Sequence, residues 1–221
     1  EGGLAVVLRT MAGQRRALRR INAPMTKPDP DLFEMRRLEM LSNTIFGVAM
    51  TLLAYDLPKT GTFASQPDWT DLYRLYAGKL SALILSFIIA GLFWFSHHRR
   101  LARQPEAGRG VVILNLFFLL SIILLPVTNG LYGNYRLSSA VAVLYGINLT
   151  LIASLNALLW WFARRDNWPD IAGAIFPVLV FVPGTAIAAV YPEYVQYFWG
   201  LAFLAVVVRR FVAPRGEGEA T

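Results

Sequence analysis

The residues of this sequence whose types and spacing suggest a function lie on one stripe of a single segment, residues 37–57. Val48, Thr51, Leu52 and Tyr55 follow one another at intervals of three, one and three residues. At 3.6 residues per turn, these intervals place all four side chains on one face of a helix. The segment has the length that a membrane-spanning helix needs. We therefore predict that this face lines a pore.

Polar and small residues interrupt the same segment and support this interpretation. Ser42, Asn43, Thr44, Gly47 and Thr51 lie among its apolar residues. A helix that faces only lipid gains nothing from such residues. They are typical of a helix that packs closely against neighbours or lines water.

Other kinds of chemistry find no support in the sequence. It contains no glycine-rich phosphate loop, metal-ligand cluster or nucleophile elbow, and it has no cysteine. His97 and His98 are its only histidines, and adjacent residues point to different faces of a helix, so they do not form a two-ligand metal site. We expect no enzymatic activity, no metal and no cofactor.

The composition indicates an all-α integral membrane protein. Of its 221 residues, 56% are hydrophobic and 16% are charged. This hydrophobic fraction exceeds that of a typical soluble domain. The apolar residues gather in six runs, which predict membrane-spanning helices over residues 37–57, 72–98, 111–129, 137–162, 168–190 and 193–208. We expect a basic tail over 1–35, a six-helix channel domain over 36–211 and a polar tail over 212–221.

The arginines predict the orientation of these helices. The arginine-rich segments are the N-terminal tail, the 99–110 loop, the region around Arg164 and Arg165, and the C-terminal tail. A six-span chain places these four segments on one side, and basic residues favour the cytoplasmic side. We expect a multi-pass protein of the cell (inner) membrane with both termini in the cytoplasm. The net charge of +7 then reflects topology, and nucleic acid is not an expected partner.

Two motifs in order resemble a known family. Arg37-x-x-x-Leu41-Ser42-Asn43 is similar to the first-helix signature Arg-x-x-x-Phe-Ser-Asp of the transmembrane protein 175 family, the lysosomal potassium channels and their prokaryotic relatives. Trp94-x-x-His97-His98-Arg99, with Leu114-Asn115 and Leu124-Leu125-Pro126 after it, resembles the family's second and third helices. These motifs cover residues 37–130, and the six-span pattern extends the likeness to residue 210.

The resemblance implies a homotetrameric cation channel that selects potassium weakly over sodium, with potassium as the permeant ion. The family's constriction is a stack of apolar side chains on the first helix, which implies a hydrophobic gate of Val48, Leu52 and Tyr55, with Thr51 offering a hydroxyl to a hydrated ion. It also implies a polar network that ties the first helix to the second and third. The matching residues are Arg37, Ser42, Asn43, Trp94 and His97.

The sequence departs from the family signature at two positions and leaves alternatives open. Leu41 replaces phenylalanine, and Asn43 replaces an aspartate whose charge would balance Arg37 or a protonated His97. The alternative functions are a proton-conducting leak, a non-conducting scaffold and an intramembrane enzyme. Among the residues, Val48 and Leu52 can also be packing residues, and Tyr55 can belong to an aromatic belt. Three asparagines are expected to serve packing rather than ion binding, namely Asn115, Asn148 and Asn156.

Overall fold

The computed structural model describes residues 32–59, 63, 66–102, 106–163, 168–204 and 206. Most of the predicted basic tail 1–35 and all of the predicted polar tail 212–221 lie outside these residues. The described part is mainly helical, with a single pair of short strands. Its elements in chain order are β1 (Leu32–Glu34), α2 (Met35–Leu52), α3 (Trp69–Leu101), β2 (Glu106–Gly108), α4 (Arg109–Asn134), α5 (Ser139–Ala163), α6 (Trp168–Ala188), α7 (Val195–Trp199) and the 3₁₀ helix η1 (Gly200–Leu204).

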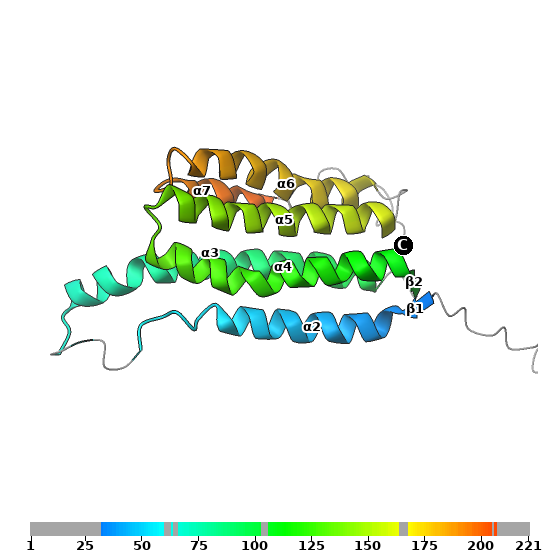
Figure 1. The fold of residues 1–221 in the computed structure, drawn as a ribbon, viewed down its shortest axis with the longest axis horizontal. Helices are drawn as coiled ribbons and strands as arrows, with labels where there is room; N and C mark the ends of the chain where they lie inside the picture. Colours follow the sequence, from blue (N-terminus) through cyan, green and yellow to red (C-terminus); the bar gives the residue numbers. More distant parts are fainter. Residues whose placement is uncertain are drawn as a thin grey trace, which may run out of the picture. The chain divides into compact units, whose positions relative to one another are not determined.

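The helices of residues 33–204 pack as a layered bundle (Figure 1). Helix α2 lies along one side and contacts α3 and α4, which form the middle layer. Helices α5, α6 and α7 cover the other side of that layer. Because α2 is at the edge of the bundle, the other described helices cover only one of its faces.

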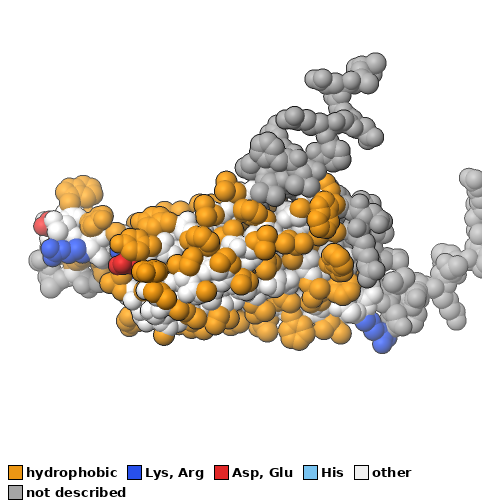
Figure 2. Space-filling model, turned by 90° about the horizontal axis from the view of Figure 1, so that it is seen from above, with side chains coloured by type: hydrophobic (Ala, Val, Ile, Leu, Met, Phe, Trp, Pro, Cys, Tyr) orange, Lys and Arg blue, Asp and Glu red, His pale blue; other side chains and the backbone are white. Residues whose placement is uncertain are grey.

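Four of these helices, α3 to α6, are long and apolar enough to cross a membrane. Figure 2 shows the matching surface, in which hydrophobic side chains cover the middle of the bundle and the visible charged side chains lie near its ends. The other two predicted spans are shorter in the described residues. Helix α2 has 18 residues and carries Arg36, Arg37 and Glu39 near its start, and the last apolar helical stretch is Val195–Leu204.

The predicted boundaries of the first two helices need correction. Helix α2 ends at Leu52 rather than at residue 57, and the chain continues in turns in which Tyr55 N–H donates to Leu52 O across 2.9 Å. Helix α3 begins earlier than predicted because Asp68 and Asp71 form a capping box. It also ends later, so that Arg99 and Arg100, which were expected in a loop, are helical.

The prediction of a purely helical chain missed a small sheet. β1 and β2 pair with each other just before α2 and α4. Each strand has three residues, which is too short to show the alternating pattern by which strands are recognised in a sequence. The pairing brings the starts of α2 and α4 together.

Polar side chains connect the middle of the bundle. Ser86 on α3 donates its hydroxyl to Asn129 Oδ1 on α4 across 2.7 Å, and its oxygen lies 2.7 Å from the Tyr145 hydroxyl of α5. All three residues are buried, so each hydrogen bond offsets the cost of removing a polar group from water. One interior cluster thus joins three consecutive helices.

Asn148 of α5 makes hydrogen bonds to α4 near Pro126, which lies inside that helix. Pro126 cannot donate a backbone hydrogen bond within α4. In the amide orientation that satisfies both of its ends, Asn148 donates to Ser121 O and accepts from Thr128 Oγ1, each across 3.1 Å. A neighbouring helix therefore supplies hydrogen bonds to residues of α4 on both sides of the proline.

Trp199 closes the far side of the bundle. Its indole ring meets Tyr132 and Tyr145 edge-on, with ring centroids 5.5 and 5.0 Å apart. It fits against two glycines: a Cβ atom added at Gly184 would lie 2.6 Å from Trp199 Nε1, and one added at Gly146 would lie 3.1 Å from Trp199 Cζ2. The short helix α7 is thus anchored by one aromatic side chain in a notch that only glycine leaves open.

Candidate functional site

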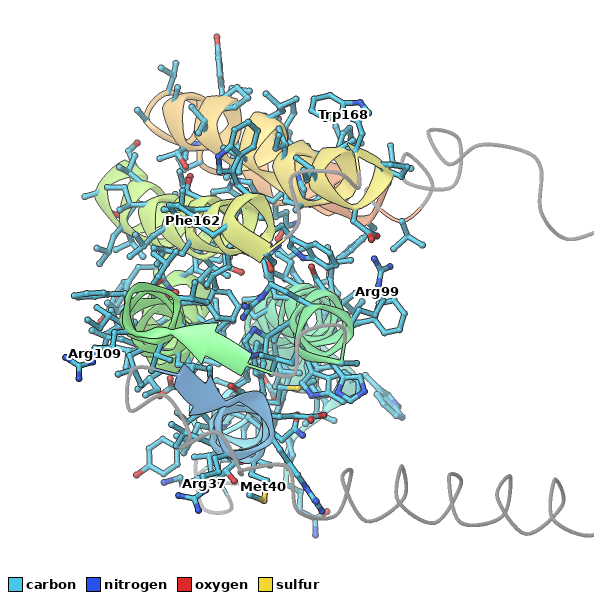
Figure 3. The ribbon with its side chains drawn as sticks, turned by 90° about the vertical axis from the view of Figure 1, so that its right-hand side faces the viewer. Arg37, Met40, Arg99, Arg109, Phe162 and Trp168 are labelled. Carbon is cyan, nitrogen blue, oxygen red and sulfur yellow. The ribbon has the colours of Figure 1, made fainter. Side chains whose placement is uncertain are left out.

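Helix α2 has one face packed against the bundle and one face, called the uncovered face, that no other described element covers. The packed face meets α3 and α4 and carries the buried residues Leu38, Ser42, Phe46, Ala49 and Leu53. Figure 3 shows Arg37 and Met40 at the start of α2 pointing away from the bundle. The exposed residues further along the helix include Leu41, Thr44, Gly47, Val48, Thr51 and Leu52.

Three of the four predicted pore residues lie on this uncovered part of α2. Val48 and Leu52 are 52% and 45% exposed and stand one turn apart. The Thr51 hydroxyl donates to Val48 O across 2.8 Å, and the Thr44 hydroxyl donates to Met40 O across 3.0 Å. Because each hydroxyl proton is used within the helix, the oxygen lone pairs of both threonines remain available as acceptors.

Tyr55, the fourth predicted pore residue, is not part of the helix. It lies in the turns that follow Leu52, so the helical spacing that grouped it with Val48 and Leu52 does not hold at this position. Its ring is 65% exposed and carries the Lys59 ammonium 4.3 Å from its centroid. The helical part of the predicted stripe therefore consists of Val48, Thr51 and Leu52.

The predicted polar network contains one direct bond between α2 and α3. Trp94 donates its indole N–H to Asn43 Oδ1 across 3.0 Å. The Trp94 ring stacks on His98, with centroids 5.6 Å apart, and His98 Nδ1 lies 3.1 Å from Glu39 Oε1. Glu39 and Asn43 are one turn apart on α2, as are Trp94 and His98 on α3, so the two helices are joined along one edge.

His97 belongs to a separate, buried cluster. Its ring packs between Phe46 of α2 and Phe118 of α4, with centroid distances of 6.0 and 5.2 Å. Arg100 places Nη2 3.0 Å from His97 Nδ1 and donates from the same nitrogen to Asn115 Oδ1 across 2.9 Å. A guanidinium can only donate, so His97 Nδ1 accepts and the ring is neutral in this arrangement.

Arg100 is the member of this cluster that the sequence reasoning missed. It is 1% exposed although it carries a positive charge, and no salt bridge to it occurs among the described residues. The sequence predicts a loop over residues 99–110, in which the arginines serve only to set topology. The spacing of three residues from His97, which places both on one helical face, was the signal that could have found it.

The other members of the predicted network have different contacts. The Ser42 hydroxyl donates within its own helix to Leu38 O across 2.7 Å, and Arg37 is exposed at the start of α2. The residues predicted to form one network are thus divided between two places. Asn43 and Trp94 make a contact at the edge of the bundle, and His97 lies in a buried cluster. On the opposite side of α3, Arg99 forms an ion pair with the buried carboxylate of Asp170 on α6 and so ties α3 to the α5–α6 layer.

Comparisons with known proteins find similarity to potassium channels. The family described as "Endosomal/lysosomal potassium channel TMEM175" matches residues 37–126, a range that contains most of α2, all of α3 and most of α4. A protein of Streptomyces collinus named as a potassium channel is 26% identical over 138 residues, which are 61% of this chain and 66% of that protein. One of a Chryseobacterium species, also named as a potassium channel, is 25% identical over 123 residues, 56% of this chain and 62% of that protein.

The aligned region therefore spans slightly less than two thirds of the length of these relatives. The fold is also similar to the crystal structure of a lysosomal potassium-selective channel TMEM175 homolog from Chamaesiphon minutus, with a TM-score of 0.66. That likeness covers 79% of this chain and 97% of the other at 18% identity. The family and these relatives are named as channels, which fits a protein without an enzymatic role. Together with its four long apolar helices, the matches show a multi-pass membrane protein that is similar to the TMEM175 family over residues 37–126.

Proposed function

We propose that the chain is the subunit of a potassium-permeable channel in which α2 lines the pore. The observation that carries this proposal is the uncovered face of α2, where Val48, Thr51 and Leu52 stand exposed while the opposite face is packed. A surface that faces lipid favours the two apolar side chains, but it is not stabilised by Thr44, Gly47 and Thr51 on the same side. The names of the relatives support a potassium channel.

The proposed assembly is a homotetramer. One chain offers one uncovered α2 face, and a single helix cannot enclose a pore. Identical subunits that share one interface usually close into a symmetric ring, and the family resemblance implies four. In such a ring the uncovered faces of four α2 helices would meet around the axis.

The proposed selectivity rests on two apolar rings rather than on a cage of carbonyls. Val48 and Leu52, one turn apart, would form successive rings along the axis. An apolar ring denies an ion its water, so the ion must shed water to pass. Potassium releases its water more readily than sodium, so weak selectivity for potassium follows. The Thr51 oxygen, which can still accept, would face a hydrated ion between the rings.

The contact of Asn43 with Trp94 has a defined part in this proposal. It holds α2 to α3 at the level between Met40 and Gly47 and so fixes the direction in which Val48 and Leu52 point. We further propose that the protein lies in the cell inner membrane with both termini in the cytoplasm, in accord with the arginine distribution.

Ion flux through liposomes that contain the purified protein tests the function. The expected result is a potassium flux that exceeds the sodium flux, with a proton flux measured in parallel. A protein that passes protons but neither metal ion would be a proton leak, which would refute the proposed potassium channel. A correctly assembled protein that passes no ion would favour the scaffold alternative.

A further inference from the structure

A groove lies at the end of the bundle where α3 begins and α4 leads into α5. It has a volume of about 510 Å³, and its lining residues are Tyr73, Arg74, Ala77, Gly78, Gly133, Asn134, Tyr135, Arg136, Leu137 and Ser138. We call it the Arg74–Arg136 groove. It is remote in sequence from the uncovered face of α2 and from the His97 cluster, and no part of the proposed function uses it.

The two arginines enter the groove from different elements. Arg74 comes from the second turn of α3, and Arg136 comes from the connection between α4 and α5. The Arg136 side chain passes beside Gly78 of α3, because a Cβ atom added at Gly78 would lie in van der Waals contact with it, 3.8 Å from Cδ and 4.0 Å from Nε. Arg74 and Gly78 are one turn apart on α3, and Arg74 and Arg136 both line the groove.

The charges in the groove are not balanced by its own residues. None of the described residues that line it is acidic, and neither Arg74 nor Arg136 has an ion pair with a described residue. The nearest acid along α3, Asp71, uses its carboxylate to accept the Asp68 backbone N–H across 3.3 Å. Two like charges that share one hollow repel each other unless an anion lies between them.

The remaining polar groups of the groove add donors. The hydroxyls of Tyr73 and Tyr135 are exposed and make no hydrogen bond within the described part of the chain. Arginine binds phosphate through two parallel N–H bonds, and a tetrahedral oxyanion has enough oxygens to accept from two such forks at once. Phenol hydroxyls can donate to the same oxygens.

From this arrangement we propose that the Arg74–Arg136 groove binds a phosphate group that carries a substituent. Arg74 and Arg136 contact the phosphate oxygens, Tyr73 and Tyr135 donate to them from the rim, and the volume beyond the two arginines holds the substituent. The phosphate can belong to an anionic lipid headgroup or to a soluble molecule. The chemistry of the site is the same in both cases, and the experiment separates them.

The test uses the full chain, purified and stripped of lipid. Native mass spectrometry measures retention of phosphatidylglycerol against phosphatidylcholine, and the thermal unfolding midpoint is followed with sodium pyrophosphate against sodium chloride. We expect preferential binding of phosphatidylglycerol or of pyrophosphate. The first result assigns the site to a lipid headgroup and the second to a soluble phosphate.

Matched variants then locate the binding. The double variant Arg74→Gln with Arg136→Gln should bind at least tenfold more weakly. Arg36→Gln with Arg109→Gln removes the same charge at the other end of the bundle, where Figure 3 places Arg109, and should bind as the parent does. Ala77→Leu keeps both arginines but fills the groove, so this variant should also lose binding. It replaces the double variant in the test if the double variant does not fold. Parent protein that binds neither ligand, or Ala77→Leu and the double variant both binding like the parent, would overturn the proposal.

Discussion

Trp94 of α3 donates its indole N–H to Asn43 Oδ1 of α2 across 3.0 Å, at the position where the family signature has an aspartate. The donor needs only an acceptor oxygen, and both asparagine and aspartate offer one. The replacement that appeared to disrupt a charge network therefore preserves this contact. The hydrogen bond between Trp94 and Asn43 explains how α2 stays attached to α3 without the aspartate of the family signature.

Variants at position 43 should separate the hydrogen bond from the charge. Asn43→Leu removes the acceptor and should lower the free energy of unfolding by about 1 kcal/mol, the usual net value of one such bond. Asn43→Asp keeps the acceptor and should change stability less than Asn43→Leu does. Thermal unfolding of both variants is the measurement, with Trp94→Phe as a second way to remove the bond. If the aspartate variant is the least stable of the three, Trp94 is not the residue that matters at this position.

The buried guanidinium of Arg100 leads to a second prediction. Its bond to Asn115 Oδ1 spans 2.9 Å, and Asn115→Leu would leave a buried charge with one partner fewer. We expect a loss of about 1–3 kcal/mol, the cost of leaving a buried polar group unsatisfied. Asn115→Asp places a carboxylate where Arg100 can pair with it and should be more stable than Asn115→Leu. Equal stability of the two variants in chemical unfolding would show that Arg100 does not depend on residue 115.

The notch that holds Trp199 leads to a third prediction. Gly184→Ala would place a methyl group 2.6 Å from Trp199 Nε1, and such overpacking typically costs about 1–3 kcal/mol. Gly91→Ala is the matched control, because a Cβ atom at Gly91 has no neighbour within 4 Å, and alanine is the better helix former. We expect a lower unfolding temperature for Gly184→Ala and an unchanged or higher one for Gly91→Ala. A normal unfolding temperature for Gly184→Ala would mean that α7 can shift freely.

These contacts show how much the sequence could predict and where it stopped. The long apolar runs predicted α3, α4, α5 and α6 within a few residues, because burial in lipid demands continuous apolar helices. The end of α2 could not be read from hydrophobicity, since residues 53–57 are as apolar as the helix itself and the change to i→i+3 bonds is a matter of backbone geometry.

The candidate site was predictable to a similar degree. The contact between Asn43 and Trp94 was implied by the family motifs, which place both residues in one network. The role of Arg100 was not, because an arginine at the end of an apolar run is typical of a loop that sets topology. Only the packing of Phe46, His97 and Phe118 places it inside the bundle. The sequence shows what residues are present, but which of two neighbouring arginines is buried depends on the rotation of α3.

The absence of cysteine in the sequence makes the topology directly testable. Pro67, just before α3, and Ala102, just after it, are both described and exposed, and each can be replaced by cysteine. We expect a membrane-impermeant thiol reagent applied outside intact cells to label Pro67→Cys and not Ala102→Cys. Permeabilised cells should show labelling at both positions. The reverse pattern in intact cells would invert the proposed orientation while leaving the fold unaffected.

The proposed constriction gives the last prediction. Val48 and Leu52 stand one turn apart on the uncovered face of α2, so in a ring of four helices each would form an apolar ring that excludes ions by denying them water. Val48→Asn or Leu52→Asn puts amides into that ring and lets a hydrated ion pass. Sodium, which holds its water more firmly, gains most from this change, so its flux relative to potassium should rise.

Met50→Leu is the control for these two variants, because Met50 is partly buried against the core instead of standing on the uncovered face. It should leave the ratio of the two fluxes unchanged. The measurement is the reversal potential with potassium on one side of the membrane and sodium on the other. Tyr55→Asn adds a further comparison: since Tyr55 lies beyond the end of α2, its effect should be smaller than that of Leu52→Asn. Val48 and Leu52 variants that conduct normally with the parent's reversal potential would place the selectivity of the channel elsewhere.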